Sequence, residues 1–140
     1  MASTQLKACL PAEANALGEL RRRINELLGS AGVAESDRYD TLLVAHELAA
    51  NAIEHGSGAR DEIEVQCNLV GKQLRLAVLD NSRSPSVPVA HKPEAEQARG
   101  RGLYLVDWLT DSWTETLVRG RRKVTATLTL QLEPRAAQRG

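Results

Sequence analysis

The sequence predicts an α+β fold, a two-layer α/β sandwich in which a mixed, mostly antiparallel sheet is covered on one face by helices. Two segments with apolar residues at helical spacing come first, and two segments of alternating apolar and polar residues follow. A long polar stretch then precedes a short helical segment and two more alternating segments. Helices and strands grouped in this way are typical of a sheet with its helices on one face.

The chain has the length of one domain. It contains 140 residues, which is within the range of about 100–200 residues for a single domain. We expect this domain to span residues 1–133, with residues 134–140 as a frayed tail.

The first half of the chain is predicted to contain two helices. The residues before Pro11 form either an edge strand or an irregular N-terminal segment. Pro11 suits the first turn of a helix. Apolar residues at helical spacing extend that helix to Gly29. Either Ser36 or Asp37 is expected to cap the second helix, which ends at Gly56.

The predicted strands form two hairpins. Gly71 and Lys72 provide the first turn, and the second turn lies around Gly120. Residues 81–102 separate the hairpins, and a loop of this length in a small domain is usually functional or mobile. A short helix follows from Leu103 and ends at Trp108 or Leu109. The predicted strands are residues 63–69, 74–80, 113–118 and 124–132.

Composition narrows the possible functions. The chain has 18 basic and 18 acidic side chains, two Trp, two Tyr and no Phe. Proteins that bind nucleic acid are usually clearly basic and often stack bases on aromatic side chains, so direct nucleic-acid binding is not predicted. Residues 1–70 hold 6 basic and 11 acidic side chains, whereas residues 71–140 hold 12 and 7. This asymmetry fits a localised anionic ligand or a partner docked on one side, with an uneven solvated surface as the alternative.

The sequence also bears on location. It shows no signal peptide and no apolar run of the ~20 residues that cross a membrane. Cys9 and Cys67 lack the spacing of metal ligands, and they do not imply a disulfide framework. We therefore expect a cytoplasmic protein with reduced thiols and no membrane partner.

A row of polar side chains marks the second predicted helix. Glu47, Asn51 and His55 recur at intervals of four residues, which places them on one helix face. A carboxylate, an amide and an imidazole in one row can bind a hydrated metal ion or activate a hydroxyl group. On spacing alone, a solvated helix face with a histidine near its C-terminus remains the alternative.

Two further features accompany this row. Asp80 ends an apolar strand and opens the polar loop, a position that suits a ligand as well as a plain turn. Gly100 and Gly102 flank Arg101 immediately before the predicted short helix. Glycines let the backbone approach a ligand, and a helix N-terminus offers N–H groups to phosphate, although a flexible loop would look the same.

A run of basic residues surrounds the second hairpin turn. Charge runs of this kind usually form a solvated hairpin tip, and a partner surface is the alternative. The run consists of Arg119, Arg121, Arg122 and Lys123.

Taken together, the polar row, the strand-end aspartate and the glycine pair resemble the Bergerat-type ATP-binding fold of histidine-kinase-like ATPases. The segment from Val44 to Gly56 is similar to the first motif of that superfamily, and the segment from Gly100 to Val106 is similar to its last. The resemblance extends over residues 6–132. With no dimerisation helices and no second domain, the chain is most similar to the anti-sigma-factor serine kinase branch.

The resemblance implies a role for each feature. Glu47 would act as the general base, Asn51 would coordinate Mg²⁺, and Asp80 would accept a hydrogen bond from the adenine amino group of ATP. The backbone of residues 100–102 would contact the phosphates, and residues 86–99 would form a mobile lid. The nucleotide site would comprise Asn51, His55, Asp80, Ser82, Arg83, Gly100, Arg101, Gly102 and Leu103.

One position departs from the family pattern. Ser82 stands where the second motif has a glycine, and its Cβ would crowd the adenine pocket. The resemblance implies a protein-serine kinase that binds a sigma factor and phosphorylates an anti-sigma-factor antagonist. It leaves open whether the protein forms a homodimer. The first alternative is a non-catalytic protein-binding module of the same fold, which Ser82 favours. The second is a histidine-kinase catalytic domain that acts in trans.

Overall fold

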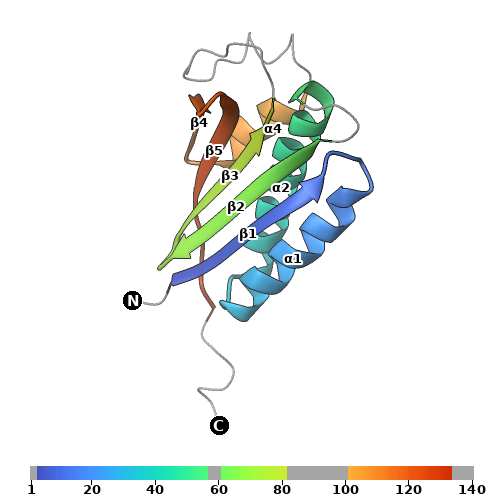
Figure 1. Cartoon of the computed structure of the whole chain (residues 1–140). Coiled ribbons are helices and arrows are strands. Elements are labelled where there is room, and N and C mark those ends of the chain that lie inside the picture. Colours follow the sequence, from blue (N-terminus) through green and yellow to red (C-terminus); the bar gives the residue numbers. More distant parts are fainter. Residues whose placement is uncertain (1–2, 57–60, 82–100, 134–140) are drawn as a thin grey trace.

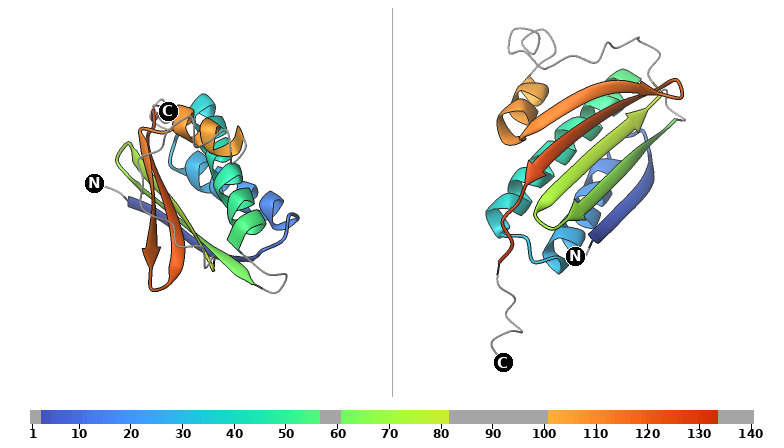
Figure 2. Two further views of the ribbon diagram at one scale, coloured as in Figure 1. Left: turned by 90° about the horizontal axis from the view of Figure 1, so that it is seen from above. Right: turned by 90° about the vertical axis from the view of Figure 1, so that its left-hand side faces the viewer.

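The computed structural model describes residues 3–56, 61–81 and 101–133 of the chain. In these ranges, three helices lie on one face of a five-stranded sheet of order β1-β2-β3-β5-β4, and all neighbouring strands are antiparallel (Figure 1 and Figure 2). The predicted α+β sandwich is therefore confirmed. The elements are β1 (Ser3–Pro11), α1 (Ala16–Ser30), α2 (Glu35–Gly56), β2 (Glu62–Val70), β3 (Gln73–Asp80), α4 (Arg101–Leu109), β4 (Ser112–Val118) and β5 (Arg121–Thr129).

Helix α2 forms the centre of the helical layer. It packs between α1 and α4 and against β2, β3 and β5, and it crosses the covered face of the sheet (Figure 2). The buried residues of its second half are small or medium in size, so the helix and the sheet approach each other closely. These residues are Val44, Ala45, Leu48, Ala49 and Ala52. None of the helices in the described ranges is long and apolar enough to cross a membrane.

Alternation along the strands separates the two faces of the sheet. In β2 every second side chain is buried against the helices, while the side chains between them face the open side. A row of valines crosses three strands, because Val65 lies opposite Val78 and Val78 lies opposite Val124. Such cross-strand apolar pairs stabilise a sheet and fix its register.

Both predicted hairpin turns are confirmed. Val70 and Gln73 pair on either side of the first turn, where Gly71 has a φ of 61°. In the second turn, Arg119 and Gly120 have φ values of 53° and 79°. Positive φ at two consecutive residues is the requirement of a type I′ turn, whose twist matches that of the flanking strands.

Several predicted boundaries are wrong. Pro11 ends β1 instead of starting a helix, and it lies opposite Glu62 on an edge strand, where a missing N–H group is tolerated. Helix α1 begins only at Ala16, and β5 spans Arg121–Thr129 instead of residues 124–132. The edge-strand interpretation of the residues before Pro11 is confirmed.

The predicted cap of the second helix is also wrong. Helix α2 begins at Glu35, so Ser36 and Asp37 lie inside its first turn. The carboxylate of Asp37 instead accepts a hydrogen bond of 2.6 Å from the backbone N–H of Gln131. The backbone N–H of Ala34 donates to the carbonyl of Gln131 at 2.8 Å. The side chain of Asp37, which the local sequence pattern predicts as a helix cap, therefore forms a long-range hydrogen bond instead.

The two cysteines give a direct test of the sheet orientation. Cys9 is exposed, whereas Cys67 in β2 is 1% exposed and burial raises its pKa to about 12. Because the thiolate is the reactive form, we expect a disulfide reagent such as DTNB to label one thiol in the native protein and two in guanidinium chloride. The Cys9→Ser variant should then show no native labelling. Rapid native labelling of that variant would contradict the inward orientation of β2.

Candidate functional site

Glu47 and Asn51 lie one turn apart on the same flank of α2, as their spacing predicts. Both side chains are half-buried because they border the stripe of residues that packs against the sheet. His55 is one turn further along the same helix, but its side chain lies outside the described part of the structure. The helix therefore brings a carboxylate and an amide to one partly covered surface.

These two side chains have the properties of ligand-binding groups. Neither Glu47 nor Asn51 forms a hydrogen bond or an ion pair with another residue in the described ranges. Half-buried polar groups of this kind need water or a ligand to offset their lost hydration. Their oxygen atoms are the hard ligands that Mg²⁺ prefers. The side chains present therefore fit a magnesium ion at this flank.

A dedicated metal cage is not found. Among the described residues, no group of three or more His, Cys, Asp and Glu side chains is placed to hold a metal ion. Mg²⁺ often binds through one or two protein oxygens together with water and the phosphates of a nucleotide. Asn51 could supply such an oxygen, so the α2 flank suits a metal that arrives with a nucleotide.

Asp80 lies at the end of β3 on the face that the helices cover. Its side chain is only 1% exposed. The guanidinium of Arg122 donates two hydrogen bonds to Oδ2 of Asp80, from Nε at 3.0 Å and from Nη2 at 2.7 Å. The two residues are direct partners in the pairing of β3 with β5. The strand-end carboxylate is therefore part of a buried ion pair.

Arg122 does not belong to a solvated hairpin tip, so that prediction is wrong for this residue. It is the second residue of β5, faces the helices and is 5% exposed. Its neighbour Arg121 faces the open side of the sheet, where it donates to Asn81 at 3.1 Å and to Glu64 at 3.3 Å. Alternation continued backward from Val124 would have placed Arg122 inside.

Sequence reasoning also missed Glu115. This residue of β4 is 2% exposed, and its Oε2 lies 4.0 Å from Nη1 of Arg122. Its inward position follows the same alternation as Trp113, two residues earlier. Asp80, Arg122 and Glu115 thus form a buried charged cluster across three neighbouring strands.

The glycine-containing segment is described only in part. Ser82, Arg83, Gly100 and the predicted lid over residues 86–99 lie outside the described residues. Helix α4 begins at Arg101, two residues earlier than predicted. Arg101 and Gly102 therefore lie in its first turn instead of in a loop, together with Leu103, although the side chains of these three residues lie outside the description.

The elements that carry the candidate residues meet at one end of the fold. The end of β3, the C-terminal end of α2 and helix α4 lie at the same end of the molecule (Figure 1). Helix α4 also packs directly against α2. The fold therefore assembles the polar helix flank, the strand-end aspartate and the last motif, which are far apart in the sequence.

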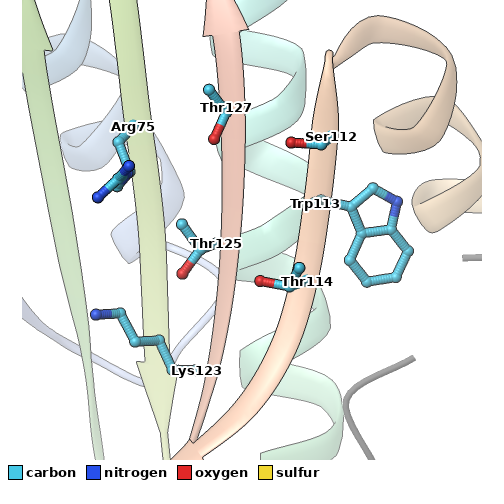
Figure 3. A pocket seen from close by; sticks show the side chains of 7 residues that line it. All are labelled: Arg75, Ser112, Trp113, Thr114, Lys123, Thr125 and Thr127. Carbon is cyan, nitrogen blue, oxygen red and sulfur yellow. The ribbon is translucent and has the colours of Figure 1, made fainter. Parts of the chain in front are cut away.

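A hollow on the open face of the sheet is a separate feature. It has a volume of about 260 Å³ and lies over β3, β5 and β4 (Figure 3). The indole of Trp113 points away from it toward the helical side, while threonine hydroxyls, Arg75 and Lys123 surround it (Figure 3). Since α2 lies on the opposite face, this hollow is not the predicted site.

Comparison with known proteins agrees with this arrangement. The family model described as the histidine kinase-like ATPase domain matches residues 10–130. A comparison with curated proteins gave no match.

Solved structures show the same fold. The RsbU and RsbW domains of Rv1364c from Mycobacterium tuberculosis match with a TM-score of 0.70 and 24% identity, over 94% of this chain and 34% of that chain. This chain thus spans about a third of the length of that protein. The catalytic domain of histidine kinase ThkA matches with a TM-score of 0.52 and 14% identity, over 95% of this chain and 100% of that chain.

The family match includes all of α2, β3 and α4, the elements on which the candidate residues lie. The sequence resemblance to histidine-kinase-like ATPases is therefore confirmed, and the chain belongs to the histidine kinase-like ATPase domain family.

Proposed function

We propose that this protein is an ATP-dependent protein-serine kinase of the anti-sigma-factor type. It would bind a sigma factor and phosphorylate an antagonist protein on a serine side chain. The observation that carries this proposal is the half-buried pair of Glu47 and Asn51, which has no partner in the described ranges. The family match and the likeness to a structure that contains an RsbW domain support it.

In the proposed reaction, the serine hydroxyl of the antagonist attacks the γ-phosphorus of ATP. The new O–P bond forms as the bond from the γ-phosphorus to the bridging oxygen breaks, and ADP leaves. Glu47 takes up the hydroxyl proton as general base. The amide oxygen of Asn51 would hold Mg²⁺, and the metal would neutralise phosphate charge.

An exposed aromatic pair supports a protein partner. Tyr104 and Trp108 lie one turn apart on α4 and are 50% and 76% exposed. Large aromatic side chains are enriched among the residues that contribute most to protein interfaces. We place the contact with the sigma factor on this face of α4, next to the first turn of that helix.

The second candidate is a non-catalytic binding module of the same fold. It is favoured by the ion pair that Arg122 forms with Asp80 and by Ser82 in place of the motif glycine. A protein that captures a sigma factor but transfers no phosphate to any candidate antagonist of its own genome would support this candidate. Phosphate transfer to a serine of one antagonist would reject it.

The role of Glu47 can be tested by Glu47→Gln. This change keeps size and hydrogen bonding but removes the basic carboxylate, so binding of Mg²⁺-ATP should persist. Transfer of labelled phosphate to the antagonist should fall by about 10²–10⁴-fold, the usual contribution of a general base. Asp40→Asn is the matched control, because Asp40 lies two turns earlier on the same helix flank and is also half-buried. Transfer at the wild-type rate by Glu47→Gln would show that another group takes the proton.

The role of Asn51 predicts a metal-dependent loss of affinity. Asn51→Ala removes the proposed oxygen ligand, so calorimetry should show weaker binding of Mg²⁺-ATP and little change for ATP in EDTA. Asn51→Asp retains an oxygen ligand and should keep the dependence on Mg²⁺. Equal affinities of Asn51→Ala for the two forms of ATP would be inconsistent with metal binding at this residue.

A further inference from the structure

The hollow on the open face of the sheet is lined by a guanidinium, an ammonium and several hydroxyl groups. These groups belong to Arg75, Lys123, Ser112, Thr114, Thr125 and Thr127 (Figure 3). No described residue that lines the hollow is Asp or Glu. A guanidinium and an ammonium group only donate hydrogen bonds, and a hydroxyl group can donate one. The lining therefore suits a ligand that carries negative charge and accepts hydrogen bonds.

The two cations of the hollow have no partner of their own. Arg75 and Lys123 form no ion pair and no side-chain hydrogen bond with another residue in the described ranges. Lys123 is also half-buried, so its ammonium group has lost part of its hydration without gaining a counter-charge. The hollow is therefore a place of uncompensated positive charge.

The carboxylates nearby on the open face are engaged elsewhere. Glu64 of β2 lies 3.3 Å from Nη1 of Arg121 and 3.7 Å from Nζ of Lys7. Asp111, next to the start of β4, accepts a hydrogen bond of 2.6 Å from Oγ1 of Thr129. Neither carboxylate forms an ion pair with a cation of the hollow, so a negative charge there has to come from another molecule.

The strand register gives the spacing of the two cations. Lys123 lies opposite Leu79, which is four residues along β3 from Arg75. Four residues of a strand span about 13 Å. Thr125 lies between the two cations (Figure 3). In an extended peptide, two side chains four residues apart point to the same side and have the same separation of about 13 Å.

The size and lining of the hollow argue against a small organic ligand. Pockets for such ligands usually measure about 300–1,000 Å³ and are mostly apolar. This hollow measures about 260 Å³ and is lined chiefly by polar side chains. A single small anion bound at one cation would leave the other cation, about 13 Å along the strand, without a counter-charge. An extended segment with two carboxylates serves both cations.

We propose that this hollow binds an extended acidic segment of a partner protein, with one carboxylate at Arg75 and a second, four residues away, at Lys123. The hydroxyl groups between the two cations would donate to the carbonyl oxygens of that segment. The hollow lies on the face opposite α2, so this docking site is separate from the proposed nucleotide site. Its test does not depend on phosphate transfer.

A titration followed by NMR tests the proposal on the purified, ¹⁵N-labelled full chain. The probe is the capped peptide Thr-Glu-Thr-Val-Thr-Glu-Thr, whose strand-forming residues carry two glutamates four residues apart. We expect the amide signals of Thr114, Thr125 and Thr127 to shift, while those of α2 stay in place. Exposed ion pairs are weak and screened by salt, so the dissociation constant should be about 0.1–1 mM and should rise with NaCl. No shift at about 2 mM peptide would overturn the proposal.

Three further probes of the wild-type chain test the spacing and the charge. The peptide Thr-Glu-Thr-Val-Glu-Thr-Thr has its glutamates three residues apart and thus on opposite sides, so it should bind at least about threefold more weakly. The same seven-residue peptide with glutamine for both glutamates should not bind. Inorganic phosphate should bind at least about threefold more weakly than the first peptide. Equal affinity for any of these probes would overturn the proposal, and equal affinity for phosphate would indicate a simple anion site.

Substitution of the two cations gives the matching test on the protein. Arg75→Gln and Lys123→Gln should each weaken binding of the first peptide by about threefold, and the double variant by about tenfold. Lys7→Gln is the matched control, because it removes the same charge from β1 on the same face of the sheet, outside the hollow. An equal loss in Lys7→Gln would indicate diffuse attraction and overturn the proposal. The peptide comparisons decide the matter on the wild-type chain if a variant does not fold by circular dichroism.

A second copy of this chain is the competing occupant of the hollow. Sedimentation of the protein without peptide distinguishes it from a partner segment. We expect the state of association of Arg75→Gln to equal that of the wild type. A wild-type dimer that dissociates in Arg75→Gln would show that a second copy covers the hollow, and it would overturn the proposal.

Discussion

The packing of α2 against the inner face of the sheet is the constraint on which the other features depend. Ala45, Ala49 and Ala52 are at most 2% exposed, so the second half of the helix lies close to the strands. A helix held this closely cannot rotate, and its flank positions are therefore fixed relative to the end of β3. Glu47 and Asn51 occupy that flank. Their half-burial follows from the width of the apolar stripe, which ends beside them.

The same inner face stops being apolar where β3 ends. The row that contains Val65, Val78 and Val124 is entirely apolar, and the next inward positions of β3 and β5 are Asp80 and Arg122. Burying charge at this point requires compensation, which the two hydrogen bonds to Oδ2 and the nearby Glu115 provide. An ion pair is a weak source of stability compared with apolar packing. The pair lies at the end of the fold where β3, α2 and α4 come together.

The sequence was informative where structure depends on neighbours in the chain. The helical spacing in α1 and α2, the alternation in β2 and the glycine turns are local, and each was predicted correctly in kind. Pro11 was misread because its meaning depends on pairing with Glu62, far along the chain. Asp37 was misread for a similar reason, since its carboxylate accepts from Gln131, 94 residues away. The strand order was not predicted because it depends entirely on such contacts. Arg122 was predicted to be exposed because it lies within a run of basic residues, whereas its side chain faces the helices.

The candidate site shows the same division between local and long-range information. Glu47 and Asn51 lie on one helix, so their spacing alone brings them together. The surroundings of Asp80 depend instead on a strand partner 42 residues away. A sequence motif therefore predicts where this aspartate lies in the fold. It does not predict which side chains form hydrogen bonds with it. Residues that face each other across paired strands can bond to each other, so a substitution in β5 changes the hydrogen bonds of its partner in β3. The surroundings of Asp80 are consequently a property of the strand pair, whereas the closeness of Glu47 and Asn51 is a property of the helix.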